Sequence, residues 1–189
     1  MTIDPAALLP IRVLHDFARR MELLNIPYML TGSMAMFQYS NYRMTSDIDF
    51  VLELLSHQSD AFIQYLEPDY YIPHGSMKRA INSKRMFNIL NQENSFKIDC
   101  VMLKQTPFHI NAFERRDSVD FYGKRISIIR LEDLIISKLL WAADSKSEKQ
   151  LADIKNLMRN PFDETYIETW TIKLGLEEAY RQCRSEIEK

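Results

Sequence analysis

The sequence predicts an α+β domain that ends in a helical region. Near the start of the chain, Leu9, Val13 and Phe17 recur at the four-residue spacing of an amphipathic helix. Residues 46–54 instead alternate polar and apolar side chains, which is typical of a half-buried strand. After residue 130 the sequence contains only helical patterns. With 46% hydrophobic and 26% charged residues in 189, the composition excludes a disordered or fibrous chain.

A strand–turn–helix unit follows the first predicted helix, which covers residues 8–24. Residues 26–31 are mostly β-branched, aromatic or long apolar side chains and predict a short strand. Gly32 and Ser33 end that strand, and residues 34–40 predict a short helix. The alternating strand at residues 46–54 comes next.

The remaining elements comprise helices and two hairpins. Turn-forming residues separate the strands of each hairpin. We expect helices over 57–66, 131–143 and 146–158, one or two helices within 161–189, and strand pairs over 85–90 with 95–103 and within 117–129. This order divides the chain into a core over 1–130 and a helical region over 131–189.

Charge and cysteine content exclude several classes of protein. Basic and acidic residues nearly balance, 24 against 26, which argues against a dedicated nucleic-acid-binding surface. The start of the chain lacks a signal peptide's positive charge, and no apolar run approaches the ~18 residues of a membrane helix. We therefore expect a cytoplasmic protein without a membrane partner. Cys100 and Cys183 match no metal or disulfide spacing and are expected to be reduced thiols.

Two carboxylates stand two residues apart in the strand at 46–54. Side chains at i and i+2 share one face of a strand, so Asp47 and Asp49 point the same way. Like charges at this separation repel unless a cation lies between them. Mg²⁺ is held by one or two carboxylates together with substrate phosphates, which suits this pair. The alternative is a solvated outer face of an edge strand.

A third carboxylate lies on the later strand at 95–103. Asp99 projects from the face opposite Ile98 and Cys100. If the two strands are neighbours, three aspartates converge, as two-metal phosphoryl-transfer sites require. The alternative is an exposed strand residue beside Lys97.

Gly32 and Ser33 could bind an anion. A turn before a helix presents free backbone N–H groups and a hydroxyl, which suit a triphosphate. The alternative is an ordinary helix start, in which Ser33 is the N-cap and Gly32 relieves the turn.

These motifs together resemble the nucleotidyltransferase superfamily typified by DNA polymerase β. Gly-Ser, a short helix, Asp-x-Asp and a distant Asp are arranged here as in that superfamily. The resemblance implies a mixed, twisted sheet flanked by helices. It also implies that Asp47, Asp49 and Asp99 bind Mg²⁺ and act in catalysis, and that Gly32 and Ser33 contact the nucleotide phosphates.

A narrower resemblance extends from Leu24 to Met158. The residues at 43–47 and 85–89 are similar to those of small prokaryotic nucleotidyltransferases of the abortive-infection and toxin–antitoxin type. In such relatives, a lysine resembling Lys138 serves nucleotide binding, and Asp153 follows in a second element. Here Gln150 replaces an acid that often precedes that element, and no role is assigned to Asp153.

Lys138 also stands out without the resemblance, because its helical stripe is otherwise apolar. Its ammonium could extend to water along the surface, or it could meet a phosphate in a nucleotide cleft. A cluster of basic residues lies before and at the start of the strand at 85–90 and comprises Lys78, Arg79, Lys84 and Arg85. It is either a solvated helix face or a surface that steers a phosphate-bearing acceptor toward the site. The four histidines show no ligand spacing and receive no role.

The sequence thus predicts Mg²⁺-dependent transfer of a nucleoside monophosphate from an NTP, with Mn²⁺ as a substitute cation and pyrophosphate as product. The acceptor stays open among an RNA end, a protein hydroxyl and a small molecule. The alternative is a catalytically weak antitoxin or regulatory module that binds nucleotide or a partner protein. A structural metal-binding domain is a third reading, although it leaves Gly32 and Ser33 unexplained. A homodimer is also compatible with the sequence.

Overall fold

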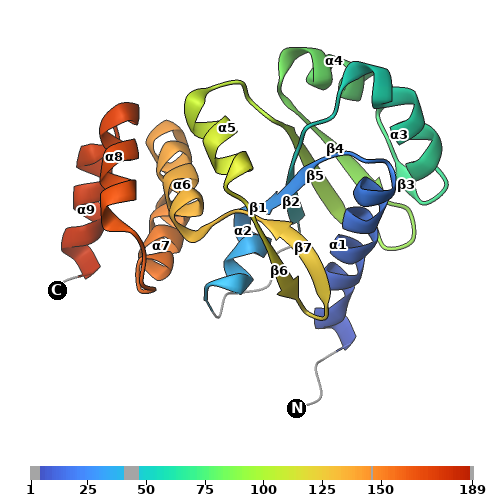
Figure 1. Cartoon of the computed structure of the whole chain (residues 1–189). Coiled ribbons are helices and arrows are strands. Elements are labelled where there is room, and N and C mark those ends of the chain that lie inside the picture. Colours follow the sequence, from blue (N-terminus) through green and yellow to red (C-terminus); the bar gives the residue numbers. More distant parts are fainter. Residues whose placement is uncertain (1–4, 41–46, 146, 188–189) are drawn as a thin grey trace.

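The computed structural model describes residues 5–40, 47–145 and 147–187. Its centre is a seven-stranded mixed sheet with helices on both faces (Figure 1). The spatial order of the strands is β3 (Tyr70–Tyr71), β4 (Met86–Asn91), β5 (Lys97–Met102), β2 (Asp47–Leu52), β1 (Tyr28–Thr31), β7 (Lys124–Ile128) and β6 (Asp117–Phe121). β2 pairs with β5 and β1 pairs with β7 in parallel, whereas the other neighbours are antiparallel. The expected α+β fold class is confirmed.

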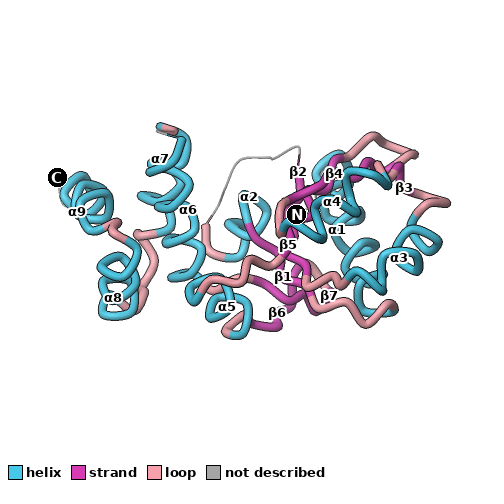
Figure 2. The backbone as a smooth tube through the Cα atoms, turned by 90° about the horizontal axis from the view of Figure 1, so that it is seen from above, coloured by secondary structure: helices cyan, strands magenta, loops and turns pink. Residues whose placement is uncertain are grey.

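Helices cover both faces and one end of the sheet. They are α1 (Pro5–Leu23), α2 (Gly32–Ala35), η1 (Met36–Gln38), η2 (Ser56–Gln58), α3 (Ser59–Leu66), α4 (His74–Ser83), α5 (Pro107–Glu114), α6 (Leu131–Ser145), α7 (Glu148–Leu157), α8 (Glu164–Leu174) and α9 (Glu177–Ile187). In Figure 2, α1, α3 and α4 lie on one side of the sheet, and α2 and α6 lie on the other. The strand–turn–helix unit and both hairpins are confirmed.

The main core lies on the α1 side of the sheet. Ile48, Phe50 and Leu52 of β2 are fully buried there, and the Phe50 ring lies 4.9 Å from the ring of Phe17 on α1. Because side chains alternate along a strand, the carboxylate at Asp49 must project from the opposite face. Because the buried apolar side chains of β2 face α1, its carboxylates project toward the side of the sheet that carries α2 and α6.

Three elements are absent from the expected elements, namely the two-residue strand β3 and the helices α4 and α5. Helix α5 begins at Pro107, a residue suited to the first helical position because it lacks an N–H. Its apolar side chains Phe108, Ala112 and Phe113 are buried. The segment between the two predicted hairpins therefore contains a helix that joins the core to the C-terminal region.

The helices α6 to α9 gather at one end of the molecule (Figure 1). Asp133 on α6 is fully buried and accepts hydrogen bonds from Arg115 Nε, just after α5, at 3.2 Å and from the Tyr166 hydroxyl on α8 at 2.5 Å. This network ties the helical region to the core across the predicted boundary at residue 130. The division of the chain into two parts at that boundary stays a prediction.

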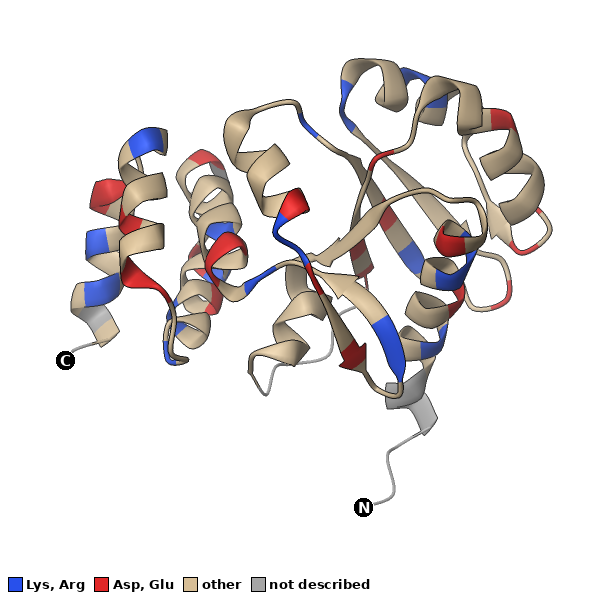
Figure 3. Ribbon diagram, in the orientation of Figure 1, with Lys and Arg blue, Asp and Glu red and all other residues tan. Residues whose placement is uncertain are grey.

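Cys100 and Cys183 are both buried and form no disulfide, which agrees with the expected reduced thiols. Lys and Arg residues are distributed over many elements, with Asp and Glu among them (Figure 3). Within the described ranges, no helix combines the length and apolar character needed to cross a membrane.

Candidate nucleotide-transfer site

The parallel pairing of β2 with β5 brings the predicted aspartates together. Asp49 is directly opposite Asp99 in the register, and Asp47 is opposite Lys97. Because both strands are in phase, all four side chains project from the same face of the sheet. The expected approach of the two strands is confirmed, and the catalytic roles stay predictions.

The site concentrates negative charge. Burial, followed by the neighbouring charges of Asp99 and Asp47, raises the pKa of Asp49 to about 6. Lys97 Nζ lies 2.9 Å from Asp99 Oδ2 and 3.5 Å from Asp47 Oδ2. Although burial opposes it, the hydrogen bond to Asp99 raises the pKa of Lys97, so its ammonium stays charged. Lys97 therefore partly neutralises the carboxylates.

Asp99 is only 7% exposed, so the alternative of an exposed strand residue is wrong. Its Oδ1 is buried and has no hydrogen-bond partner in the described part of the chain. An orphaned carboxylate oxygen beside a second carboxylate fits a hard cation such as Mg²⁺. Among residues 5–40, 47–145 and 147–187, however, no group of three or more His, Cys, Asp or Glu side chains is arranged to hold a metal ion as it stands.

Gly32 packs directly against Asp49. It has a positive φ of 64°, and a Cβ built at this position would lie 2.0 Å from Asp49 Oδ2. Only glycine fits here, because a side chain would displace the carboxylate. The turn therefore places backbone against the acidic site, as the motif predicted.

Ser33 is half-buried within α2, which begins at Gly32 and has Thr31 at its N-cap position. The N-cap is therefore Thr31 and not Ser33, whereas the positive φ of Gly32 agrees with the part of that alternative in which Gly32 relieves the turn. The residues that lead into the Asp-x-Asp motif, Arg43 to Ser46, lie outside the described residues. Of the similar segment at 43–47, the structure therefore describes only Asp47.

Lys138 on α6 is buried, with an exposed fraction of 3%, which excludes the alternative that it reaches water. Its Nζ donates hydrogen bonds to Asp153 Oδ2 at 2.8 Å and to Gln150 Oε1 at 3.2 Å, both on α7. Burial lowers the pKa of Lys138, while Asp153 and Asp49 oppose that shift. Sequence reasoning missed this internal pair, although Gln150 and Asp153 are three residues apart on one helix face.

A cavity of about 230 Å³ lies next to Asp49, between the sheet and α6. Apolar side chains make up much of its wall, with a few polar groups among them. It is lined by Thr31, Gly32, Asp49, Val51, Val101, Met102, Lys104, His109, Leu134, Ser137, Lys138 and Trp141. The cavity thus joins three of the predicted residues, Gly32, Asp49 and Lys138.

Three solved structures with a similar fold are nucleotidyltransferases or a nucleotidyltransferase-like protein. ANT(2'')-Ia in complex with adenylyl-2''-tobramycin aligns over 90% of this chain and 98% of its own, with 12% identity and a TM-score of 0.58. The lincomycin-bound lincosamide antibiotic adenylyltransferase LnuA aligns over 84% and 98%, with 16% identity and a TM-score of 0.51. An antigenic nucleotidyltransferase-like protein from Paracoccidioides brasiliensis aligns over 78% and 72%, with 16% identity and a TM-score of 0.54.

The chain has the nucleotidyltransferase fold. No protein-family model and no curated protein matches the sequence. The likeness to these solved structures is therefore one of fold. The narrower resemblance to abortive-infection and toxin–antitoxin nucleotidyltransferases stays a prediction.

His109 on α5 is a cavity residue that sequence reasoning missed. Burial, followed by the charge of Lys104, lowers the pKa of His109 to about 4, so its imidazole is neutral at pH 7. Thr106 Oγ1 lies 2.6 Å from His109 Nδ1, a hydrogen-bond distance that fixes the ring. The sequence did not single out His109, because the helix α5 that carries it was not predicted. Only the tertiary arrangement brings His109 to the same cavity as Gly32.

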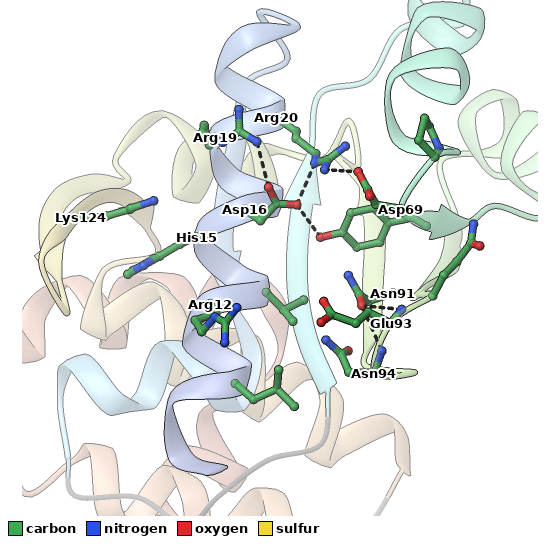
Figure 4. A pocket seen from close by; sticks show the side chains of 15 residues that line it. Arg12, His15, Asp16, Arg19, Arg20, Asp69, Asn91, Glu93, Asn94 and Lys124 are labelled. Atoms are coloured by element: carbon green, nitrogen blue, oxygen red, sulfur yellow. Dashed lines mark hydrogen bonds and ion pairs between the residues drawn. The ribbon is translucent and has the colours of Figure 1, made fainter. Parts of the chain in front are cut away.

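A second cavity, of about 920 Å³, lies on the α1 side of the sheet (Figure 4). Asp16 at its edge accepts hydrogen bonds from Arg19, Arg20 and the Tyr70 hydroxyl, and Arg20 also pairs with Asp69. These groups satisfy one another, so we interpret the network as structural. It lies on the face opposite the aspartates.

The predicted basic cluster also lies away from the aspartates. Lys78 and Arg79 are exposed on α4, and Lys78 pairs with Asp60 at 3.5 Å. Neither they nor Lys84 and Arg85 line the cavity beside Asp49. The structure favours the interpretation as a solvated helix face.

Proposed function

We propose that this protein transfers a nucleoside monophosphate from an NTP to an acceptor hydroxyl, with release of pyrophosphate. One observation carries the proposal: Asp49 and Asp99 face each other on adjacent parallel strands of a nucleotidyltransferase fold, and the Gly32 backbone packs against Asp49. A phosphoryl-transfer site needs positioned carboxylates beside a place for phosphates. The proposed cation is Mg²⁺, with Mn²⁺ as a substitute.

In this proposal the acceptor oxygen bonds to the α-phosphorus of the NTP as the bond to the bridging oxygen of the β-phosphate breaks. Asp99 accepts the acceptor's proton, and pyrophosphate leaves with the electron pair of the broken bond. Asp47, Asp49 and Asp99 hold the cation, which neutralises phosphate charge when it is bound. The protein supplies orientation and charge complementarity.

The phosphates are proposed to lie along Gly32 and Ser33, where the turn exposes backbone N–H groups. Lys138 lines the same cavity and is proposed to contact a phosphate with its Nζ while it keeps its hydrogen bonds to Asp153 and Gln150. An ammonium has three donors, so one is left for the phosphate.

We infer that the acceptor is a small molecule. The cavity beside Asp49 is compact and largely apolar, with Trp141 and the neutral His109 on its wall, which suits a small organic group. Basic residues in the described chain alternate with acidic ones over the fold (Figure 3), which does not favour a long RNA. The structures of LnuA with lincomycin and of ANT(2'')-Ia with adenylyl-2''-tobramycin support a small-molecule acceptor.

The test incubates the full chain with each NTP, Mg²⁺ or Mn²⁺, and separate small-molecule, protein and RNA acceptor pools. Pyrophosphate release identifies the donor, and mass spectrometry of each pool identifies the acceptor class. We expect Asp99→Asn to lose turnover and retain NTP binding, whereas the exposed control Asp60→Asn retains both. NTP binding by wild type without turnover in any pool would favour the regulatory module. Absence of both would refute the proposal.

A further inference from the structure

Lys97 places a positive charge among the proposed cation ligands. It opens β5 directly beside Asp47, and it precedes Asp99 by two residues on the same face of the sheet. Its Nζ is within 3.5 Å of a carboxylate oxygen of each, 2.9 Å for Asp99 and 3.5 Å for Asp47. The ammonium therefore bridges carboxylates from two neighbouring strands.

A bridging cation between shared carboxylates is the position that one member of a metal pair takes in two-metal sites. The Lys97 ammonium occupies this position, and the Lys97 side chain is 35% exposed to solvent. The backbone fixes this placement, because the register between β2 and β5 sets Lys97 beside Asp47.

The two oxygens of Asp99 have different surroundings. Oδ2 accepts the hydrogen bond from Lys97, whereas the buried Oδ1 has no hydrogen-bond partner among the described residues. A buried ionised oxygen without a partner is costly, and a cation ligand removes that cost. Asp49, the register partner of Asp99, is the adjacent carboxylate.

Formal charge supports a single divalent cation at this site. Asp47, Asp49 and Asp99 together carry three negative charges, and Lys97 returns one positive charge. One divalent cation then balances the cluster before any nucleotide binds. A second divalent cation at the place that the Lys97 ammonium occupies between Asp47 and Asp99 would meet a like charge, which repels it.

We propose that Lys97 is a resident counter-ion that takes the place of one of two divalent cations, so that Asp47, Asp49 and Asp99 bind a single divalent cation in this chain. This inference rests on the proposed function, because it requires that the carboxylates bind a cation. It adds that the Lys97 ammonium holds Asp47 and Asp99 together.

The test counts Mn²⁺ ions bound to the full chain by electron paramagnetic resonance, with and without a non-hydrolysable NTP analogue. We expect one ion per wild-type chain and two per Lys97→Met chain with the analogue. The affinity of the chain for Mn²⁺ should rise roughly ten- to a hundredfold, because Lys97→Met removes the ammonium that competes with the cation for the carboxylates. This range corresponds to the strength of a charge-assisted contact. Lys124→Met is the matched control, because Lys124 is an exposed strand lysine on the wall of the opposite cavity.

Folding of each variant is checked by circular dichroism, and Lys97→Gln repeats the test with a polar side chain if Lys97→Met does not fold. Two ions in wild type, or one ion in both wild type and the Lys97 variant, would overturn the inference and leave the proposed function standing. No Mn²⁺ binding in any variant would refute this inference together with the metal dependence in the proposed function.

Discussion

Replacing Asp49 with asparagine should stabilise the fold at neutral pH while it damages the site. Burial and the charges of Asp99 and Asp47 raise the pKa of Asp49 from 3.8 to about 6, so the folded chain holds this carboxylate ionised at a cost. A shift of about two units corresponds to about 3 kcal/mol. Because Asp49 is partly exposed, solvent screening reduces the expected gain to about 1–3 kcal/mol for Asp49→Asn. Asparagine has the same shape and keeps the contact with Gly32.

The sign of the pH dependence follows from linkage. Below about pH 4 the carboxyl is protonated in both the folded and the unfolded chain, so wild type and Asp49→Asn should be equally stable with respect to this group. Between about pH 4 and 6 the unfolded chain releases its proton while the folded chain retains it, and wild type loses stability as pH rises. The advantage of Asp49→Asn should therefore grow across this window and stay constant above it.

The assay is urea denaturation from pH 4 to pH 8 in the presence of a chelator, with the free energy of unfolding obtained by linear extrapolation. Asp60→Asn, which removes an exposed carboxylate, should change stability by no more than about 0.5 kcal/mol. Addition of Mg²⁺ at pH 7 should stabilise wild type by RT ln(1 + c/Kd), where c is the free Mg²⁺ concentration, and should stabilise Asp49→Asn less, because its Kd is higher. A variant that is less stable than wild type at pH 7, or whose advantage does not vary with pH, would refute this reasoning.

Two further substitutions test other parts of the site. Gly32→Ala should cost more stability than Gly175→Ala by about 2 kcal/mol or more in urea denaturation, because both glycines have positive φ but only at Gly32 would the Cβ meet Asp49; equal losses would contradict the close packing. Lys138→Met should cost about 3–5 kcal/mol because it breaks the 2.8 Å ion pair between Lys138 and the buried Asp153, and the added change Asp153→Leu should recover most of that loss. If Lys138→Met alone is neutral, the buried pair does not hold the two helices together.

Local patterns in the sequence predicted most of the elements that carry the site. The alternation in β2 placed Asp47 and Asp49 on one face, and the turn residues predicted the hairpin that contains β5. These features depend on near neighbours in the chain, since a strand period of two and a turn propensity act over a few residues. The same reasoning predicted that Gly32 follows a strand.

Partners across space could not be read in this way. The parallel register that pairs Asp49 with Asp99 joins two strands, β2 and β5, between which the chain forms η2, α3, β3, α4 and β4. Lys138 was expected at water or a phosphate, and the structure instead pairs it with Asp153 on the next helix. Its apolar stripe predicted burial of the stem, but the identity of the buried counter-charge depends on how α6 and α7 pack.

The sequence by itself therefore determined the order of most elements, the face that carries the carboxylates and the glycine that ends β1. Only the tertiary structure decided that Lys97 bridges Asp47 and Asp99, that Lys138 is buried against Asp153, and that α5 brings a neutral histidine to the cavity. The physical reason is that backbone periodicity is a local property. Ion pairing and pKa shifts depend on which strands and helices become neighbours and on how much water remains between them.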